Sequence, residues 1–333
     1  MSRSKLYVVG DRLGWSIDDD RARLVATARR LGYDVGSNAL LRFLRDRSVF
    51  QHNHFNALQA RWLDSSHRIG LSYFHGRPGT PGYPEFDHAY AALREHAARV
   101  DRVQVTHEEM RQLVLDAGVP AERVFKIPIG IDLENFPFMQ PAQRHGFTIG
   151  SFVKDGVGMD DGLEPKLLKG PDTFVQVVER LRGTIPELGV MLTGPARGYV
   201  RAELDRLEVP YRHAVLRTRD ELARAYQETD VCLVTSRQEG GPKSVLEAMA
   251  TGVPLVTTRV GQANELVVDG ENGLLADVDD VDGLADAVQS LYTDAALRER
   301  LRAAGRKTAE AHAEERLDQL WDRLLEGFVQ RAD

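Results

Sequence analysis

The chain has 333 residues, a length that favours two domains. Hydrophobic residues make up 42% of it, and the formal net charge of −7 argues against non-specific binding to nucleic acid. No apolar run approaches the length of a membrane span, and the apolar stretch near the N-terminus is too short for a secretory signal. The single cysteine, Cys232, excludes an internal disulfide and is expected to be a small core residue. We therefore expect a cytoplasmic protein, with no membrane contact indicated by the sequence.

The first part of the chain alternates between strand-like and helix-like segments. Acidic residues Asp18 to Asp20 favour the start of a helix, and Gly32 favours its end. A second helix is expected to end at Gly118. Short apolar runs predict parallel strands, at residues 5–10, 68–74, 102–107 and 123–132.

Near residue 138 the same alternation starts again. Strands are predicted at residues 147–153, 189–195 and 231–236, with a helix from about Pro171. An amphipathic helix is expected at residues 310–330. Alternating strands and helices indicate parallel sheets, and the restart indicates two doubly wound domains. Ligands of such sheets bind beyond the carboxyl ends of the strands.

The segment EGGPKSVLE, from Glu239 to Glu247, follows one of these strands and leads into a helix. A glycine-rich turn at a helix start offers backbone N–H groups and the positive end of the helix dipole to a phosphate. Glu239 is expected at the lip of the turn and Glu247 about one turn into the helix. Two carboxylates that flank a phosphate site suit a nucleotide sugar. A surface loop followed by an ordinary helix is the plainer interpretation of such a pair.

Residues 239–280, EGGPKSVLEAMATGVPLVTTRVGQANELVVDGENGLLADVDD, closely resemble the donor-binding segment of the retaining glycosyltransferases of family 4, also called glycosyl transferases group 1. Many members have Gly-Phe-Gly after the first glutamate, whereas this chain has Gly241-Pro242-Lys243 instead. Weaker similarity extends upstream to about residue 101, and the first hundred residues match poorly.

The resemblance implies the GT-B fold, an α/β architecture in which two doubly wound, Rossmann-like parallel-sheet domains face each other across a cleft. The expected boundaries are an acceptor-side domain at residues 1–138 and a donor-binding domain at residues 139–312. A C-terminal helix at residues 313–333 is expected to return to the first domain. The first domain is unusually short for the family.

The resemblance also implies a retaining, hexosyltransferase-type glycosyltransferase that needs no metal. It would move a sugar from a nucleoside diphosphate to an acceptor hydroxyl, and the departing phosphate would take the acceptor proton. Glu239 would hold sugar hydroxyls, and Glu247 would bind ribose hydroxyls. Lys154 and Lys169 would neutralise the diphosphate, although an insertion separates them and Lys166 is an alternative. The phosphate turn itself would comprise Gly240, Gly241, Pro242, Lys243, Ser244 and Val245.

Four further positions are implied by the family pattern. His75 follows an apolar strand and would face the donor sugar, with His107 as a weaker alternative. Gly194 permits a close backbone approach to the ligand. Arg217 and Thr218 lie in a loop that would contact the base. Any one of these residues is also compatible with a purely structural role.

The acceptor site is the least defined part of this interpretation. Trp15 is a candidate for stacking on a ring, and the polar residues His52, Asn53 and His54 are candidates for lining the cleft. The acceptor is a glycan, a lipid or a small molecule. The acidic cluster at residues 18–20 is better explained as helix-start charge, and the one at 160–161 has no other ligand at convincing spacing, so neither a metal nor another cofactor is expected.

Two other classes of function remain open. The chain is alternatively a nucleotide-sugar-binding or scaffold protein with a GT-B fold that has lost transfer activity. A nicotinamide-dependent dehydrogenase is disfavoured, because the glycines at 156, 158 and 162 are followed by acidic residues and prolines rather than by a helix start.

Overall fold

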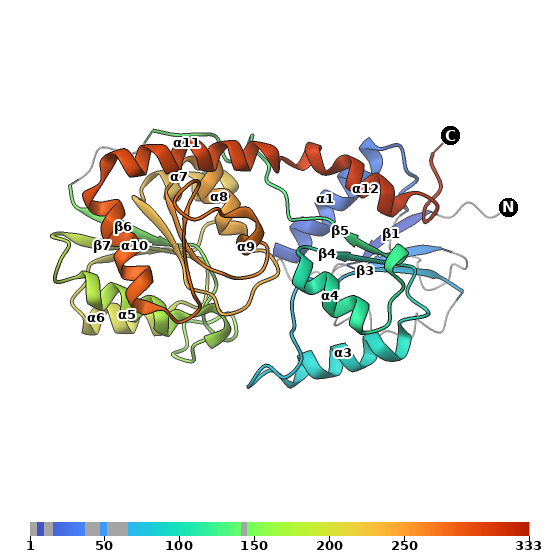
Figure 1. Cartoon of the computed structure of the whole chain (residues 1–333), viewed down its shortest axis with the longest axis horizontal. Coiled ribbons are helices and arrows are strands. Elements are labelled where there is room, and N and C mark those ends of the chain that lie inside the picture. The colour runs from blue at the N-terminus through green and yellow to red at the C-terminus, as the bar shows by residue number, and fades with distance from the viewer. Residues whose placement is uncertain (1–4, 10–15, 37–46, 52–65, 141–144, 333) are drawn as a thin grey trace. The chain divides into compact units, whose positions relative to one another are not determined.

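A computed structural model describes residues 5–9, 16–36, 47–51, 66–140 and 145–332. The chain forms two compact units: unit 1 comprises Met1–Pro128 with Glu315–Asp333, and unit 2 comprises Ile129–Glu314. Figure 1 shows the elements of both units along the chain. The candidate acceptor residues Trp15, His52, Asn53 and His54 lie outside the described residues. No helix in the described ranges combines the length and the apolar character that crossing a membrane requires.

Within the described residues, unit 1 contains a five-stranded parallel sheet with the strand order β1-β2-β3-β4-β5. Val35 bridges the other side of β1 in parallel, at Leu6. The strands are β1 (Leu6–Val9), β2 (Ser48–Gln51), β3 (Arg68–Ser72), β4 (Arg102–Val105) and β5 (Val124–Lys126). The helices are α1 (Ser16–Arg30), α3 (Pro84–His96), α4 (Glu108–Asp116), η3 (Ala121–Arg123) and α12 (Asp318–Leu325).

Unit 2 contains a six-stranded parallel sheet in its described part, with the order β11-β10-β9-β6-β7-β8. Its strands are β6 (Phe147–Ser151), β7 (Leu188–Thr193), β8 (Tyr211–Ala214), β9 (Val231–Val234), β10 (Leu255–Thr258) and β11 (Leu274–Ala276). Its helices are η4 (Leu167–Lys169), α5 (Pro171–Leu181), α6 (Gly198–Arg206), α7 (Arg219–Gln227), α8 (Lys243–Thr251), α9 (Ala263–Leu266), α10 (Val281–Thr293), α11 (Ala295–Ala311) and η5 (Glu314–Leu317), which runs into unit 1. The two parallel sheets confirm the predicted fold class.

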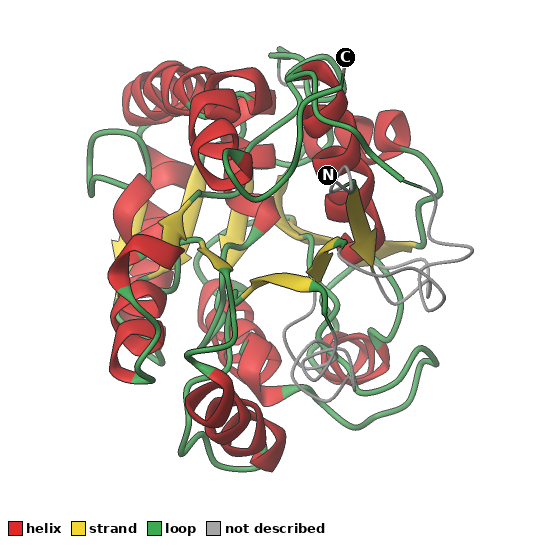
Figure 2. Cartoon of the chain, turned by 90° about the vertical axis from the view of Figure 1, so that its right-hand side faces the viewer, coloured by secondary structure: helices red, strands yellow, loops and turns green. Residues whose placement is uncertain are grey.

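Helices cover both faces of the sheet in unit 2, because successive side chains of each buried strand point to opposite faces. Val231 and Leu233 of β9 belong to the core that packs against α5, α6 and α10. Cys232 and Val234 belong to the core that packs against α7 and α8. Figure 2 shows helices on either side of the strand layers. Cys232 is fully buried, in agreement with its predicted role in the core.

The helix predicted at residues 310–330 is interrupted in the structure. α11 ends at Ala311, and α12 begins only at Asp318. The cause is a tertiary contact: the backbone of Ile131 donates a hydrogen bond to the carbonyl of His312 and accepts one from the N–H of Glu314. These bonds interrupt the α-helix after Ala311, although the amphipathic sequence pattern continues past this residue.

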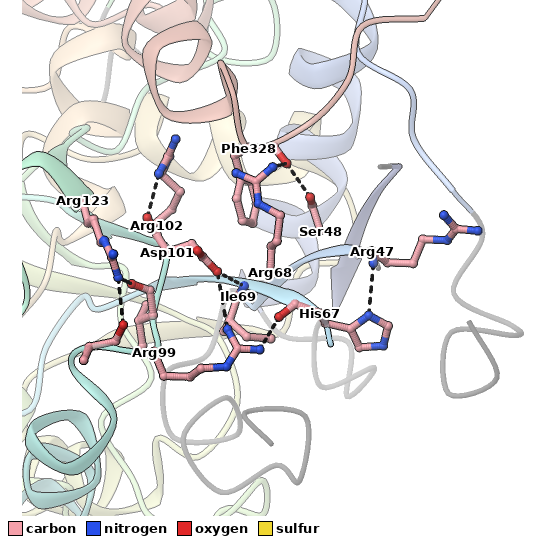
Figure 3. A network of polar contacts seen from close by, with 12 residues as sticks. Arg47, Ser48, His67, Arg68, Ile69, Arg99, Asp101, Arg102, Arg123 and Phe328 are labelled. Atoms are coloured by element: carbon pink, nitrogen blue, oxygen red, sulfur yellow. Dashed lines mark hydrogen bonds and ion pairs between the residues drawn. The ribbon is translucent and has the colours of Figure 1, made fainter. Parts of the chain in front are cut away.

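The C-terminal segment of unit 1 is held by arginines at the start of two strands. Arg68 donates a hydrogen bond of 2.9 Å to the carbonyl of Phe328, and Ser48 donates to the same oxygen. Arg102 donates to the carbonyls of Leu324 and Glu326 at 3.0 and 3.1 Å. Figure 3 shows the Arg68 and Ser48 side chains directed at that carbonyl. Residues 324–329, which include the buried Phe328, are therefore part of the core of unit 1.

Candidate functional site

The strand order of unit 2 reverses between β6 and β9, which lie side by side although two strands separate them in the chain. Strands on one side of this point continue to β7 and β8, and those on the other to β10 and β11. Diverging loops leave a crevice beyond the carboxyl ends of strands at such a reversal, and open α/β sheets bind ligands there. The segments after β6 and β9 carry Lys154 and Glu239, so both predicted residues follow strands at the reversal.

Glu239 and Lys169 form an ion pair in which Lys169 Nζ lies 2.6 Å from Glu239 Oε1. The same oxygen accepts a hydrogen bond of 2.9 Å from Ser236 Oγ. Glu239 is 9% exposed and the Lys169 side chain 22% exposed, so a low-dielectric surrounding strengthens the attraction. The structure thus brings together two predicted site residues that are 70 positions apart.

Gly170 explains how Lys169 comes so close to the end of β9. Its φ is +63°, and a Cβ atom there would lie 1.9 Å from the carbonyl oxygen of Thr235. The hydroxyl of Thr235 donates a 2.8 Å hydrogen bond to the Gly170 carbonyl. A residue without a side chain is required at this contact, and it fixes the backbone next to Lys169.

Arg237 binds residues on both sides of the Lys169–Gly170 segment. Its guanidinium donates two 2.7 Å hydrogen bonds to the carboxylate of Asp172, at the start of α5, and a third to the carbonyl of Leu167. Asp279, after β11, also accepts from Arg237. Burial alone would raise the pKa of Asp172, but the hydrogen bonds and charge of Arg237 outweigh this effect and lower the pKa.

The turn between β9 and α8 is packed closely against the segment before α9. A Cβ on Gly241 would lie 2.7 Å from Ile129 Cδ1, and one on Gly261 would lie 2.3 Å from the carbonyl oxygen of Glu239. The Gln262 side chain, directly before α9, accepts a 2.7 Å hydrogen bond from the N–H of Ile129 and donates a 2.9 Å bond to the carbonyl of the same residue. The close packing of this turn therefore leaves no room for a side chain at position 241.

Pro242 is the residue before α8, with a φ of −65°, and no side chain caps the helix start. Lys243 is partly exposed, whereas Ser244 and Val245 are buried within the first turn. Among the described residues, Ser244 Oγ has no hydrogen-bond partner. A helix of nine residues carries about half a positive charge at this end, which favours a bound anion.

Glu247 lies in α8 as predicted, and its Oε2 accepts a 2.9 Å hydrogen bond from Tyr226 Oη of α7. The carboxylate is partly buried, and the tyrosine is fully buried. The Tyr226 ring stacks on Phe152, with a centroid separation of 3.7 Å and an interplanar angle of 15°. Phe152 directly follows β6, so this ring contact joins the segment with Glu247 to the segment with Lys154.

Lys154 is half-buried, and this burial lowers its pKa. The insertion that follows it is anchored by Arg197, a fully buried side chain. Arg197 Nε lies 3.1 Å from Asp155 Oδ1, and the guanidinium donates 3.2 and 3.1 Å hydrogen bonds to the carbonyls of Ser151 and Thr193. The ends of β6 and β7 and the start of the insertion are thereby held together.

The other predicted donor-site positions lie at the ends of β7 and β8. Gly194 has a φ of +87°, and its carbonyl is 2.8 Å from His213 Nε2. Arg217 and Thr218 precede α7, where the backbone N–H groups of both donate to Glu221 Oε2. These two donors serve the start of the helix in this structure, which leaves carbonyls and side chains for a base.

His75 belongs to unit 1 and follows β3. It is partly exposed, and its ring packs edge-on against Phe86, with centroids 5.7 Å apart. The alternative, His107, is buried at the start of α4.

The acidic cluster at residues 160–161 lies in the loop after Lys154. Its Asp161 forms a 2.6 Å ion pair with Arg201 of α6.

Four residues of this site escaped the sequence interpretation: Arg197, Tyr226, Ser236 and Arg237. Ser236 and Arg237 lie between β9 and Glu239, so proximity to the motif was a usable signal. Arg197 and Tyr226 carry no local signal, because nothing in the neighbouring sequence indicates their burial or their distant partners.

Comparison with known proteins agrees with this geometry. Residues 163–308 match the model of the family described as glycosyl transferases group 1. A D-inositol 3-phosphate glycosyltransferase of Xylanimonas cellulosilytica is 33% identical over 219 residues, which cover 61% of this chain and 51% of the relative. The corresponding protein of Geodermatophilus obscurus is 32% identical over 255 residues, which cover 70% and 52%. The chain thus spans about half the length of these relatives.

Solved structures show the same fold at low sequence identity. HepE from Anabaena, determined in complex with UDP, superposes with a TM-score of 0.73 at 14% identity, over 97% of this chain and 100% of that one. Sucrose-phosphate synthase from Thermosynechococcus elongatus gives a TM-score of 0.70 at 19% identity, over 84% and 73%. Residues 163–308 therefore resemble the family of glycosyl transferases group 1, and the fold of the chain is that of the GT-B glycosyltransferases.

Proposed function

We propose that this chain transfers a hexose-type sugar from a nucleoside diphosphate to an acceptor hydroxyl, with retention of the anomeric configuration and without a divalent metal. The observation that carries the proposal is the Lys169–Glu239 ion pair beside the start of α8, where the strand order of unit 2 reverses. In a sugar phosphate, the phosphate and the sugar hydroxyls are neighbours. A lysine beside a glutamate suits such a ligand, because the cation can bind the phosphate while the carboxylate accepts hydrogen bonds from the hydroxyls.

The charge of the leaving group sets the first requirement. A departing nucleoside diphosphate carries two or three negative charges, which the N-terminus of α8, Lys169 and Lys154 would stabilise together. The lowered pKa of Lys154 reflects a poorly solvated ammonium group, and a bound diphosphate would favour its charged form. These groups replace a metal ion in the proposal.

The sugar and ribose are assigned to the two glutamates. Glu239 would accept hydrogen bonds from sugar hydroxyls and support the positive charge that develops on the ring. Glu247 would bind the ribose hydroxyls, and His75 would position the sugar. Gly194, Arg217 and Thr218 would border the base.

The reaction is a displacement at the anomeric carbon. The bond from this carbon to the acceptor oxygen forms, and its bond to the diphosphate oxygen breaks, with the electron pair leaving on the diphosphate. The acceptor proton passes to the departing phosphate oxygen, so no protein base is required. The UDP complex of HepE and the glycosyltransferase names of the relatives support a nucleotide-sugar donor.

A binding test comes first. A panel of UDP-, GDP-, ADP- and TDP-sugars is expected to include one that raises the melting temperature, since a ligand of the folded state stabilises it. Transfer of the sugar to an offered acceptor, or slow hydrolysis of the donor, then separates an enzyme from a scaffold protein that only binds. Binding without either reaction favours the scaffold, and a panel without any shift refutes both.

The ion pair supplies the mutational test. We expect Glu239→Ala and Lys169→Ala each to lower turnover by at least about a hundredfold, consistent with one lost charge contact in the transition state. The double variant should lose less than the product of the two effects, because the residues contact each other. Glu179→Gln, in an exposed pair with Arg206 at 3.9 Å, is the matched control. Wild-type turnover in both single variants would remove the assignment.

A further inference from the structure

We propose that Tyr226 is a positioning residue for recognition of the donor ribose, and that it acts through Glu247. The inference rests on the proposed function, because it assumes that Glu247 faces a ribose. It adds Tyr226 of α7 to the residues proposed to determine how the ribose is bound.

The geometry couples the two side chains closely. Tyr226 Oη donates to Glu247 Oε2 at 2.9 Å, from α7 to α8, and the tyrosine is fully buried. A carboxylate offers about four acceptor positions on its two oxygens, so the bond to Tyr226 leaves capacity for the hydroxyls of a ligand. The hydroxyl of Tyr226 thereby holds one oxygen of the Glu247 carboxylate in place.

Protonation keeps the direction of this hydrogen bond constant. Burial and the nearby charge of Glu247 raise the pKa of Tyr226 well above its ordinary value. The phenol therefore stays protonated at neutral pH and can donate its hydrogen to Glu247 Oε2. An ionised carboxylate is the form that accepts hydrogen bonds from two adjacent ribose hydroxyls.

Tyr226 is itself held from two sides by aromatic rings. Phe152 stacks on it at 3.7 Å, and Phe136 meets it edge-on at a centroid distance of 6.4 Å. A buried tyrosine ring in such a stack has little rotational freedom, so its hydroxyl marks one point in space. Phe152 follows β6 and precedes Lys154 by two residues. Its contact with Tyr226 therefore connects Glu247 to the segment that carries Lys154, a residue proposed to bind the diphosphate.

Tyr226→Phe isolates the hydroxyl, since phenylalanine preserves the stack. In the full chain we expect this variant to weaken binding of UDP-glucose about tenfold, the effect of one lost hydrogen bond to a charged group. Binding of the 2′-deoxy and 3′-deoxy ribose analogues of UDP-glucose should weaken much less, because part of the contact is already absent. Turnover at saturating donor should change less than about twofold, which separates positioning from a role in the reaction.

Tyr211→Phe is the matched control, because Tyr211 Oη also lies near a carboxylate, 3.4 Å from Asp205 in the same unit. This variant should bind all three nucleotides as the wild type does. Equal weakening of the ribose and deoxyribose donors by Tyr226→Phe would indicate a general packing defect and overturn the inference. Unchanged binding of UDP-glucose would overturn it as well.

Glu247→Ala distinguishes failure of this inference from failure of the proposed function. If Glu247→Ala abolishes the preference for ribose and Tyr226→Phe does not, only the role of Tyr226 is wrong. If Glu247→Ala binds UDP-glucose as tightly as the wild type, the ribose assignment falls and the inference falls with it. A wild-type protein that binds no sugar nucleotide overturns both.

Discussion

Lys169 and Glu239 illustrate how single residues determine this site. They are 70 positions apart, yet their charged atoms lie 2.6 Å from each other, because Gly170 lets the backbone pass against Thr235. A larger residue at position 170 would push Lys169 away from the carboxylate. The position of one glycine therefore decides whether a cation and an acid share the same site.

Asp172 allows the support around Lys169 to be tested through pH. Its pKa is lowered by Arg237, so the pair contributes stability above the unfolded pKa of about 3.9 and loses it as the pH falls through the lower folded value. Asp172→Asn should cost about 1–2 kcal/mol at pH 7. The difference from the wild type should shrink as the pH falls below about 4, because the unfolded chain then binds a proton at this carboxyl that the folded chain binds only at lower pH.

Urea unfolding followed by circular dichroism at pH 7 and at decreasing acidic pH checks this expectation. Asp282→Asn is the control, because Asp282 pairs with Arg180 at 2.6 Å but is 70% exposed. Its substitution should change the free energy of unfolding little at any pH. A difference between the wild type and Asp172→Asn that persists undiminished to pH 3 would contradict the assigned role of the pair.

Among the elements, the C-terminal segment shows how unit 1 depends on a distant part of the chain. Phe328 is fully buried, and the guanidinium groups of Arg68 and Arg102 lie 5.2 and 5.7 Å from its ring centroid. Its backbone carbonyl accepts from Arg68. Apolar burial and cation–π contacts thus act on the same residue.

Phe328→Ala should destabilise unit 1 by about 3–5 kcal/mol, the usual cost of removing a buried aromatic side chain. Trp321 packs edge-on against Phe50 in unit 1, and the sequence of unit 2 contains no tryptophan, so tryptophan fluorescence during urea unfolding reports on unit 1. Phe138→Ala, at a residue of unit 2 that is 41% exposed, should leave the fluorescence transition nearly unchanged. Equal shifts in both variants would show that Phe328 does not stabilise unit 1 specifically.

At the scale of the whole molecule, nearly all proposed donor contacts fall within one unit. Lys154, Lys169, Glu239 and Glu247 belong to unit 2, and only His75 belongs to unit 1. A nucleotide without a sugar should therefore bind to unit 2 and stabilise that unit alone. UDP is a suitable probe, since the related HepE was solved with it.

Hydrogen exchange provides the measurement. Excess UDP should slow amide exchange at residues 167–170 and 239–247, because a ligand raises the free energy of the local openings that allow exchange. The strands β3 and β4 of unit 1 should exchange at unchanged rates. Protection confined to unit 1 would place the nucleotide elsewhere and refute the proposed site.

Much of the fold could be predicted from the sequence because its signals are local. The strand after residue 230 and the helix that contains Glu247 appear as predicted, since an apolar run, a glycine-rich turn and a helical pattern each act over a few residues. The strand expected at residues 123–132 is shorter, and β5 ends at Lys126, close to Pro128. The break between α11 and α12 could not be predicted, because it depends on hydrogen bonds to Ile131, far away in the chain.

For this protein the sequence alone determined the class of fold, the restart of the pattern midway and the turn beside Glu239. Each of these is encoded by hydrogen bonding and apolar spacing within a short segment. Only the tertiary structure decided which side chains meet: Lys169 with Glu239, Tyr226 with Glu247, and Arg197 with the ends of two strands. Such contacts arise where separate segments pack together, and the burial and charge balance that they create have no signature in the neighbouring residues.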